Sequence, residues 1–241
     1  MSGPSHNTVI TGSTRGIGFA LASHLIEHGH CVTLNYAHDE QQAQAAMAML
    51  PENAAVRLVR ADVTSEAHAR RLVEQASADR PIDLWINNVG PFLYKPYAAT
   101  TVDEWRDILD ANLTSTFICC QAVLSHMRAT GHGVILNVAT MNATAKRATP
   151  NTLPYAIAKA GIVMLTQTLA KTEAKNGIRI NAIGPGFVEC GDYPPEDIKR
   201  TIPIGRLIRR EEVCAAVSFL ASDAASAITG AILDIHGGAL L

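Results

Sequence analysis

A tyrosine and a lysine four residues apart have the right chemistry to move a proton to or from a carbonyl oxygen. They are Tyr155 and Lys159, and Pro154 precedes them. Residues four apart share one face of a helix. A free phenol has a pKa of about 10, so a nearby cation is needed for it to exchange a proton near neutral pH. Pro154 suits a first helical turn, where the helix dipole adds positive potential. Taken alone, the pair could still be a chance surface feature.

A glycine-rich turn near the start of the chain predicts a phosphate site. It follows a short apolar run at 9–11 and opens an amphipathic helical pattern at 16–28. The turn consists of Thr11, Gly12, Ser13, Thr14, Arg15, Gly16, Ile17 and Gly18. Glycines let the backbone approach a pyrophosphate, and the free amides of a helix N-terminus attract its charge. The alternative is a plain turn, which this order of strand, turn and helix disfavours.

The end of the second apolar run bears on the choice of cofactor. Sites for NAD(H) usually carry an acidic residue there, but this chain has Asn35 and Tyr36. Arg15 in the glycine turn could pair with a 2'-phosphate. The sequence therefore predicts NADP(H), with NAD(H) less favoured. In the alternative, Arg15 is only solvated and Asp39 binds the ribose.

Short β-branched runs alternate with longer helical patterns, which is typical of repeated βαβ units. The expected strands are 9–11, 31–35, 55–60, 82–86, 134–138, 178–183 and 231–235. Most are nearly all apolar, as strands covered on both faces should be. We expect an α/β fold, a doubly wound parallel sheet of about seven strands with helices on both faces. At 241 residues we expect one domain over 1–241.

Two long helical patterns, 102–129 and 153–175, hold more apolar and small residues than one buried stripe needs. An interface between subunits would explain the surplus. A single broad face against the sheet would explain it equally well. The loosest stretch of the chain is 189–195, which contains Gly191, Pro194 and Pro195 and is expected to be a loop near the site.

Composition argues against several kinds of partner. The net charge is -2 and no long charged run occurs, which disfavours nucleic acid and anionic membranes. Charged or polar residues interrupt every apolar run, so we expect no membrane span and no export. Five cysteines without a CxxC pair, and scattered histidines, predict reduced thiols, no metal and a cytoplasmic location.

Read together, these motifs resemble the short-chain dehydrogenase/reductase family over essentially the whole chain. Asn87-Asn88-Val89-Gly90 after the fourth strand and the Tyr155 to Lys159 helix complete the pattern. The likeness is strongest to 3-oxoacyl-acyl-carrier-protein reductases, through Asn35-Tyr36-Ala37, Pro185-Gly186-Phe187 and the tail from Phe219 to Gly238. The resemblance implies a Rossmann fold, hydride transfer between a nicotinamide cofactor and a carbonyl or secondary alcohol, and a homotetramer or homodimer.

The resemblance also assigns roles to positions. Gly12, Gly16 and Gly18 would hold the pyrophosphate, Asp62 and Val63 would border the adenine, and Lys159 would bind the nicotinamide ribose. The residues that would hold the nicotinamide are Pro185, Gly186 and Val188. The full predicted cofactor set is Gly12, Ser13, Thr14, Arg15, Gly16, Ile17, Gly18, Asn35, Tyr36, Asp62, Val63, Asn88, Val89, Gly90, Tyr155, Lys159, Pro185, Gly186 and Val188.

The predicted catalytic set is Asn112, Thr140, Tyr155 and Lys159. The family usually has Ser where Thr140 stands, so the hydroxyl donor survives with an added methyl. Asn142 and Thr144 remain rivals for the role of holding the carbonyl oxygen. Asn112 matches the position that anchors a water leading from the lysine to solvent.

Departures from the acyl-carrier reductases limit the substrate. Within the substrate loop, about 187–203, the segment 191–202 is several residues shorter than in those reductases. Their basic carrier-docking positions correspond to Gly131 and Asn176. Arg128 and Lys175 lie close enough to replace them. A 3-oxoacyl thioester is the first expectation, but a carrier-bound one is doubtful. A free ketone, a cyclic carbonyl, a sugar or a pterin, and a weakly catalytic NADPH-binding module, stay as alternatives. Enoyl reduction is disfavoured, because the related enoyl reductases space Tyr and Lys more widely.

Overall fold

Seven parallel strands form one sheet in the order β3-β2-β1-β4-β5-β6-β7 in the computed structural model, which describes residues 6–144, 148–190 and 199–239. The strands are β1 (His6–Ile10), β2 (His30–Tyr36), β3 (Val56–Arg60), β4 (Leu84–Asn87), β5 (Gly133–Val138), β6 (Ile178–Pro185) and β7 (Ile232–Ile235). The prediction of a doubly wound parallel sheet is confirmed.

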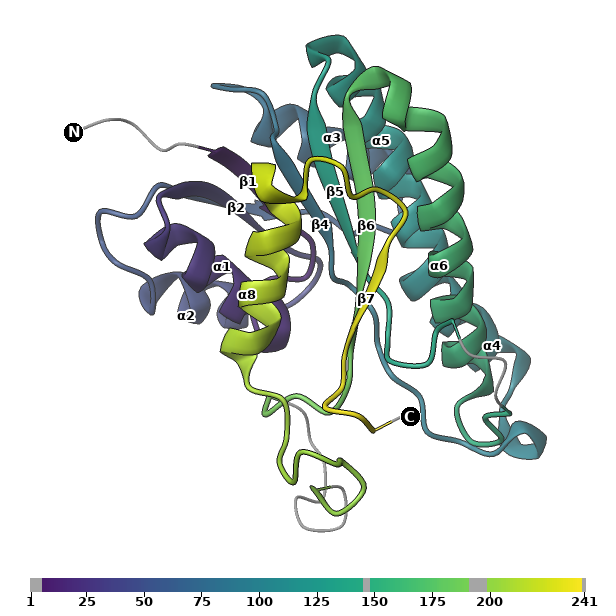
Figure 1. Cartoon of the computed structure of the whole chain (residues 1–241). Helices are drawn as coiled ribbons and strands as arrows, with labels where there is room; N and C mark the ends of the chain where they lie inside the picture. Colours follow the sequence, from purple (N-terminus) through teal and green to yellow (C-terminus); the bar gives the residue numbers. More distant parts are fainter. Residues whose placement is uncertain (1–5, 145–147, 191–198, 240–241) are drawn as a thin grey trace.

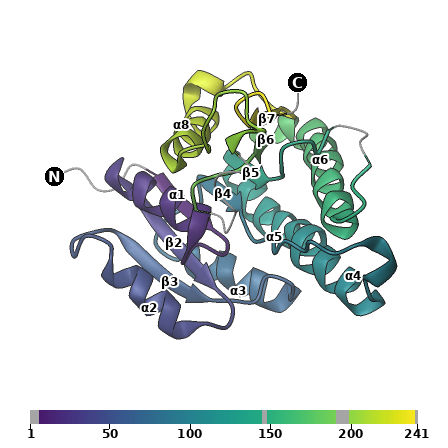
Figure 2. The ribbon, with the colours of Figure 1, turned by 90° about the horizontal axis from the view of Figure 1, so that it is seen from below.

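Helices cover both faces of this sheet (Figure 2). They are α1 (Gly16–Glu27), α2 (Glu40–Ala48), α3 (Glu66–Ala76), α4 (Val102–Leu109), α5 (Ser115–Thr130), α6 (Leu153–Glu173) and α8 (Arg210–Ala221). One core cluster joins the sheet to α3 and α5, and a second joins it to α1 and α8. Strands enclosed in this way bury both faces, and all four residues of β4 are buried.

The strand order reverses between the neighbouring strands β1 and β4. From β1 the chain adds β2 and β3 toward one edge of the sheet, and from β4 it adds β5, β6 and β7 toward the other. In open α/β sheets, ligands bind beyond the carboxyl ends of the strands at such a switch point. These ends lie at the lower edge of the sheet in Figure 1. The loops after β1, β4, β5 and β6 therefore meet where a dinucleotide site is expected.

The predicted long helix at 102–129 is divided by a π-helical turn at Asp110–Thr114, between α4 and α5. A π turn holds one residue more than an α turn, so an apolar pattern with nearly helical spacing does not reveal it. Two hydroxyl groups help to satisfy its carbonyls: Ser115 donates to Ala111 at 2.6 Å and Thr116 to Asn112 at 2.7 Å. The turn brings the buried Asn112 to the site.

The two continuous helical stretches Val102–Thr130 and Leu153–Asn176 are long and apolar enough to cross a bilayer, which corrects the expectation that no such stretch occurs. Length and composition alone are weak evidence of a span, because the core helices of layered domains pass the same test. In their most apolar windows, 50% and 39% of the residues are buried within the fold. Both stretches belong to the helical layers of the domain (Figure 1).

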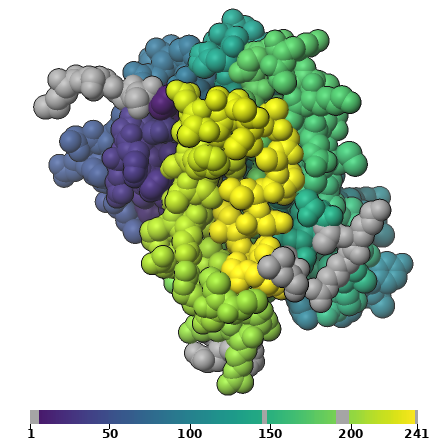
Figure 3. Space-filling view, viewed as in Figure 1, coloured from purple at the N-terminus to yellow at the C-terminus, as the bar shows by residue number. Residues whose placement is uncertain are grey.

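The segment between β6 and α8 is described at 186–190 and 199–209, and its described part projects below the sheet (Figures 1 and 3). Its two described ends are held together, because Ile208 donates from its amide to Phe187 at 2.8 Å and Glu189 to Ile208 at 3.0 Å. Much of the predicted loop at 189–195 and of the substrate loop at 187–203 lies outside the described residues, which omit 191–198.

Candidate active site

The glycine turn after β1 is fixed by hydrogen bonds to the end of β2. The amide of Gly12 donates to Asn35 Oδ1 at 3.1 Å, and the amide of Ser13 donates to the Asn35 carbonyl at 3.0 Å. Asn35 is buried and donates from Nδ2 to Ala61 at 2.9 Å. Ser13 and Asn35 therefore lie at the predicted site, where they hold the turn in shape.

The same turn is packed against the loop after β4. Asn88 donates from Nδ2 to the carbonyls of Thr11 and Gly12, at 3.0 and 2.9 Å. A Cβ built on Gly12 would lie 2.8 Å from Val89, and one on Gly18 would lie 2.5 Å from Asn88 Nδ2. Glycine is thus required by close approach at both positions.

The N-terminus of α1 is open for an anion. Arg15 is the N-cap residue, and within the described chain its side chain makes no capping hydrogen bond. Gly16 has a φ of +58°, and no described heavy atom would lie within 4 Å of a Cβ built there. Free amides beside open space at a helix N-terminus fit the pyrophosphate of a dinucleotide. Thr14 and Ile17 belong to the same turn.

At the expected adenosine end, the Asp62 carboxylate accepts from the amide and hydroxyl of Thr64, at 3.0 and 2.7 Å. Burial raises its pKa most among the separate causes, but these hydrogen bonds outweigh it and the net pKa is lowered. Val63 is buried in the core. Asp39, the alternative ribose ligand, caps α2 by accepting from the Gln42 amide at 2.8 Å.

A second cation at this end was missed from the sequence. Arg60, the last residue of β3, donates from Nε to the carbonyl of Ala37 at 3.2 Å, beside the predicted ligand Tyr36. Its side chain is exposed, as is that of Arg15. Two arginines therefore flank the region where a 2'-phosphate is expected. The adjacency of strand ends could have indicated Arg60.

The first turns of α6 bring Tyr155 and Lys159 together, with Pro154 in the first turn as predicted. The Lys159 Nζ lies 5.6 Å from the centroid of the Tyr155 ring. Lys159 is 2% exposed and donates to the carbonyl of Val138, at the end of β5, at 2.7 Å. Burial lowers the pKa of this ammonium to about 7. A cation so placed stabilises a phenolate and can itself pass on a proton.

Asn112 reaches the same place from the π turn. Its Nδ2 donates to the carbonyls of Pro91 and Ile108, both at 3.0 Å. Its Oδ1 is buried and has no hydrogen-bond partner among the described residues. A Cβ on Gly90 would lie 2.5 Å from this oxygen and 2.8 Å from Lys159 Nζ. An unpaired acceptor and an ammonium thus face one small space, which suits a bridging water.

Thr140 follows β5 and is half-buried, next to the nicotinamide loop expected after β6. A Cβ on Gly184 would lie 3.0 Å from its carbonyl oxygen. Its rivals differ from it: Asn142 has a left-handed φ of 71°, and Thr144 is exposed. Thr140 lies two residues after the end of β5, and its role in holding a carbonyl oxygen stays a prediction.

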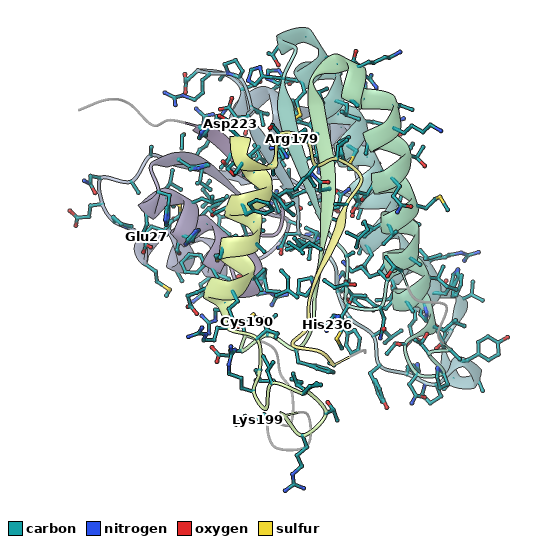
Figure 4. All side chains as sticks on the ribbon, viewed as in Figure 1. Glu27, Arg179, Cys190, Lys199, Asp223 and His236 are labelled. Atoms are coloured by element: carbon teal, nitrogen blue, oxygen red, sulfur yellow. The ribbon has the colours of Figure 1, made fainter. Side chains whose placement is uncertain are left out.

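Pro185 is the last residue of β6, Gly186 and Val188 follow it, and Val188 is buried. A Cβ on Gly186 would lie 3.0 Å from His236 Cα and 3.2 Å from Met141 Sδ. Figure 4 shows His236 and Cys190 at this same end of the sheet. The predicted nicotinamide residues are thus brought to the end of β5, where Lys159 is held.

An aromatic residue of the site was also missed. Phe92, in the loop after β4, meets the Tyr155 ring edge to face, with centroids 5.0 Å apart and ring planes at 84°. The contact joins a loop and a helix that are distant in the sequence, and no local pattern predicts it.

A family model described as Enoyl-(Acyl carrier protein) reductase matches residues 12–239. The chain belongs to the short-chain dehydrogenase/reductase family. This confirms the predicted family and the prediction of an oxidoreductase.

Three members of the short-chain dehydrogenase/reductase family illustrate the likeness. Cis-4-hydroxycyclohexanecarboxylate dehydrogenase of Sinomonas cyclohexanicum is 38% identical, over 95% of this chain and 94% of that protein. The 3-ketoacyl-(acyl-carrier-protein) reductase of Brucella melitensis, solved with NADH, has a TM-score of 0.90 at 27% identity over 98% of this chain and 99% of that one. A gluconate 5-dehydrogenase of Burkholderia cenocepacia, solved with NADP and tartrate, has a TM-score of 0.90 at 32% identity over 98% and 95%.

Proposed function

We propose that this chain transfers a hydride reversibly between NADP(H) and a carbonyl or secondary alcohol. The observation that carries the proposal is the buried Lys159 ammonium above the Tyr155 ring, held at the end of β5. The open N-terminus of α1, the shaped glycine turn and the unpaired Asn112 oxygen fit a bound dinucleotide.

Four residues have separate roles in the transfer of the proton: Tyr155, Lys159, Thr140 and Asn112. When bound, the dinucleotide supplies or accepts the hydride. In reduction, the Tyr155 hydroxyl gives its proton to the developing alkoxide, and Lys159 stabilises the phenolate that remains. The Thr140 hydroxyl donates to the carbonyl oxygen and orients it. A water held by Asn112 returns a proton through Lys159.

Preference for NADP(H) over NAD(H) is part of the proposal. Arg15 and Arg60 are exposed near the expected ribose, and a guanidinium pairs well with a phosphate. Asp39 is engaged at the N-cap of α2.

The first substrate to test is a 3-oxoacyl thioester, because of the likeness to acyl-carrier reductases. Delivery by an acyl carrier protein is disfavoured. Arg128, a candidate docking residue, is bound by Glu173 through hydrogen bonds of 2.8 and 2.7 Å, and Asn176 binds the same carboxylate at 2.8 Å. Lys175 remains as the exposed cation nearby. The relative named for a ring alcohol makes a free cyclic ketone the second candidate.

We also propose a cytoplasmic homotetramer or homodimer. Phe117 on α5 and Ile157 and Met164 on α6 are 45%, 42% and 67% exposed. Large apolar side chains exposed on neighbouring long helices favour contact between copies of the chain. A monomeric mass by light scattering would contradict this part.

The direct test follows NADPH oxidation against acetoacetyl thioesters, open-chain and cyclic ketones, sugars, a dihydropterin and an enoyl thioester. We expect turnover of a carbonyl substrate, lost at least 100-fold or so in Tyr155→Phe while NADPH still binds. Tight NADPH binding without turnover of any substrate would favour the weakly catalytic binding module instead. Turnover of the enoyl thioester alone would replace the proposed reaction with double-bond reduction.

A further inference from the structure

The loop after β4 places an exposed phenylalanine against the catalytic tyrosine. Phe92 is 60% exposed, although it contacts the Tyr155 ring edge to face. An aromatic side chain left this open has lost little of its contact area to the fold and presents an apolar face beside the Tyr155 ring. Such a face favours a substrate with apolar surface close to its carbonyl carbon.

Phe92 is carried by a loop that is held at several points. The carbonyl of the adjacent Pro91 accepts from Asn112 Nδ2 at 3.0 Å. Further along, the amide of Lys95 donates to Asn151 at 2.7 Å and that of Tyr97 to Pro150 at 3.1 Å. The loop is therefore tied to the π turn and to the segment before α6. A side chain fixed in this way discriminates between substrates by shape.

The positive charge of the loop is neutralised by a carboxylate of α4. Lys95, the cation of the loop, binds both carboxylate oxygens of Glu104, at 2.6 and 2.8 Å. The aromatic residues Tyr94 and Tyr97 are 70% and 72% exposed. In the loop after β5, Met141 lies beside Gly186. The described surroundings of Tyr155 thus favour an apolar group over an anionic chain.

A cyclic ketone and an open-chain ketone lose different amounts of conformational entropy when they bind against the Phe92 side chain. The carbons next to the carbonyl of an alicyclic ketone are already fixed, so the ring lies against an aromatic face with little loss of conformational entropy. An open chain must give up several rotamers for the same contact. The Phe92 and Tyr155 rings are in contact, with centroids 5.0 Å apart, so this apolar surface lies directly beside the catalytic tyrosine.

We propose that Phe92 is a specificity-determining residue that makes alicyclic ketones and alcohols the preferred substrates of this site. The inference rests on the proposed function and narrows it. Phe92 takes no part in the proton transfer. It contacts the ring carbons beside the reacting centre and holds them against Tyr155.

The test compares cyclohexanone with hexan-2-one, which have equal numbers of carbons, in wild type, Phe92→Ala and Phe92→Leu. Cyclohexanone is intrinsically the more reactive toward hydride, so the decisive quantity is the change in the ratio of kcat/KM values between variants. In Phe92→Ala we expect the cyclic to open-chain ratio to fall about tenfold or more. Phe92→Leu, which keeps an apolar side chain, should retain part of the ratio.

Tyr94→Ala is the matched control, because it removes an exposed aromatic side chain from the same loop. Tyr94 accepts from Asn151 Nδ2 at 3.0 Å, so its loss would loosen the loop. We expect the ratio to stay at the wild-type value. An equal fall in this variant would assign the effect to loop order and overturn the role of Phe92.

Two other outcomes distinguish a failure of the role of Phe92 from a failure of the proposed function. If open-chain ketones are reduced normally and Phe92→Ala leaves the ratio unchanged, the inference fails and the proposed function stands. If wild-type protein reduces no carbonyl, both fail together. NADPH affinity, measured by fluorescence, should be equal in all variants, because Phe92 is outside the predicted cofactor set.

Discussion

The ammonium of Lys159 donates a 2.7 Å hydrogen bond to the carbonyl of Val138, the last residue of β5. A helix residue is thereby anchored to the sheet at the point where the catalytic loops converge. The bond satisfies one of three donors, and burial still lowers the pKa of the ammonium to about 7. Folding thus imposes a charge cost at the catalytic centre.

That cost predicts an unusual pH dependence of stability. The unfolded Lys159 keeps a pKa near 10.5, so between pH 7 and that value the unfolded chain binds more protons. Stability should therefore rise with pH in this window. Relative to Lys159→Met, wild-type protein should gain up to about 3 kcal/mol in unfolding free energy between pH 7 and pH 9.5. Urea unfolding without cofactor measures it, and a constant difference would contradict the burial of a chargeable amine.

Thr140 should be needed for its hydroxyl rather than for its methyl. Thr140→Ala removes the donor to the carbonyl oxygen and should lower kcat/KM about 100-fold or more, with unchanged NADPH affinity. Thr140→Ser should stay within a few-fold of wild type. Comparable activity in Thr140→Ala and wild type would transfer the role to Asn142 or Thr144, which Asn142→Ala and Thr144→Ala would then locate.

Arg15 and Arg60 should determine the choice between NADPH and NADH. Replacing either arginine with Ala removes a charge-assisted contact to the 2'-phosphate and should raise the Kd of NADPH about tenfold. The Kd of NADH should change little. Fluorescence titration of both cofactors measures this, with Arg57→Ala as control, since Arg57 pairs with Asp79 on the surface. An equal rise in the Kd of NADPH and of NADH would show that the arginines do not recognise the 2'-phosphate.

His30 should make the fold sensitive to mild acid. Burial, and then the neighbouring His6 ring 5.0 Å away, lower its pKa from 6.5 to about 4. The folded protein disfavours the charged ring, so its stabilising contribution is complete above pH 6.5 and is lost as the pH falls toward 4. Solvent screening reduces the effect to roughly 1 to 2 kcal/mol.

Thermal unfolding at pH 7 and pH 5 provides the measurement for His30. The loss of stability on acidification should be smaller in His30→Gln than in wild type. His132→Gln is a control of opposite sign, because Asp83, which binds His132 at 3.0 Å, raises its pKa and stabilises the fold in acid. An identical acid response in wild type and His30→Gln would place the sensitive group elsewhere.

The sheet could be predicted because its signals are local. Strands enclosed by helices need apolar side chains on both faces, and runs such as Leu84–Asn87 and Gly133–Val138 carry that requirement in the sequence. The glycine turn and the Tyr155 to Lys159 spacing are local in the same sense. Strand limits differed from the prediction by three residues at most, as at the start of β1.

What the sequence did not reveal depends on contacts between distant segments. Phe92 and Tyr155 meet only after the β4 loop and α6 are placed. Arg60 reaches Ala37 only because β2 and β3 are neighbours. The π turn was missed for another reason: it adds one residue to a pattern whose apolar spacing continues on both sides.

The additional residue of the π turn interrupts the regular α-helix but also places Asn112 in the site. Deleting one residue from Asp110–Thr114 would let α4 and α5 join as one unbroken α-helix, with its backbone bonds restored to the usual pattern. The flanking helices would keep nearly the same orientation, because a π turn takes up its additional residue locally. Asn112 would then lose its place beside Gly90 and Pro91. A one-residue-shorter chain would therefore have a more regular helix but would no longer place the Asn112 oxygen beside Lys159.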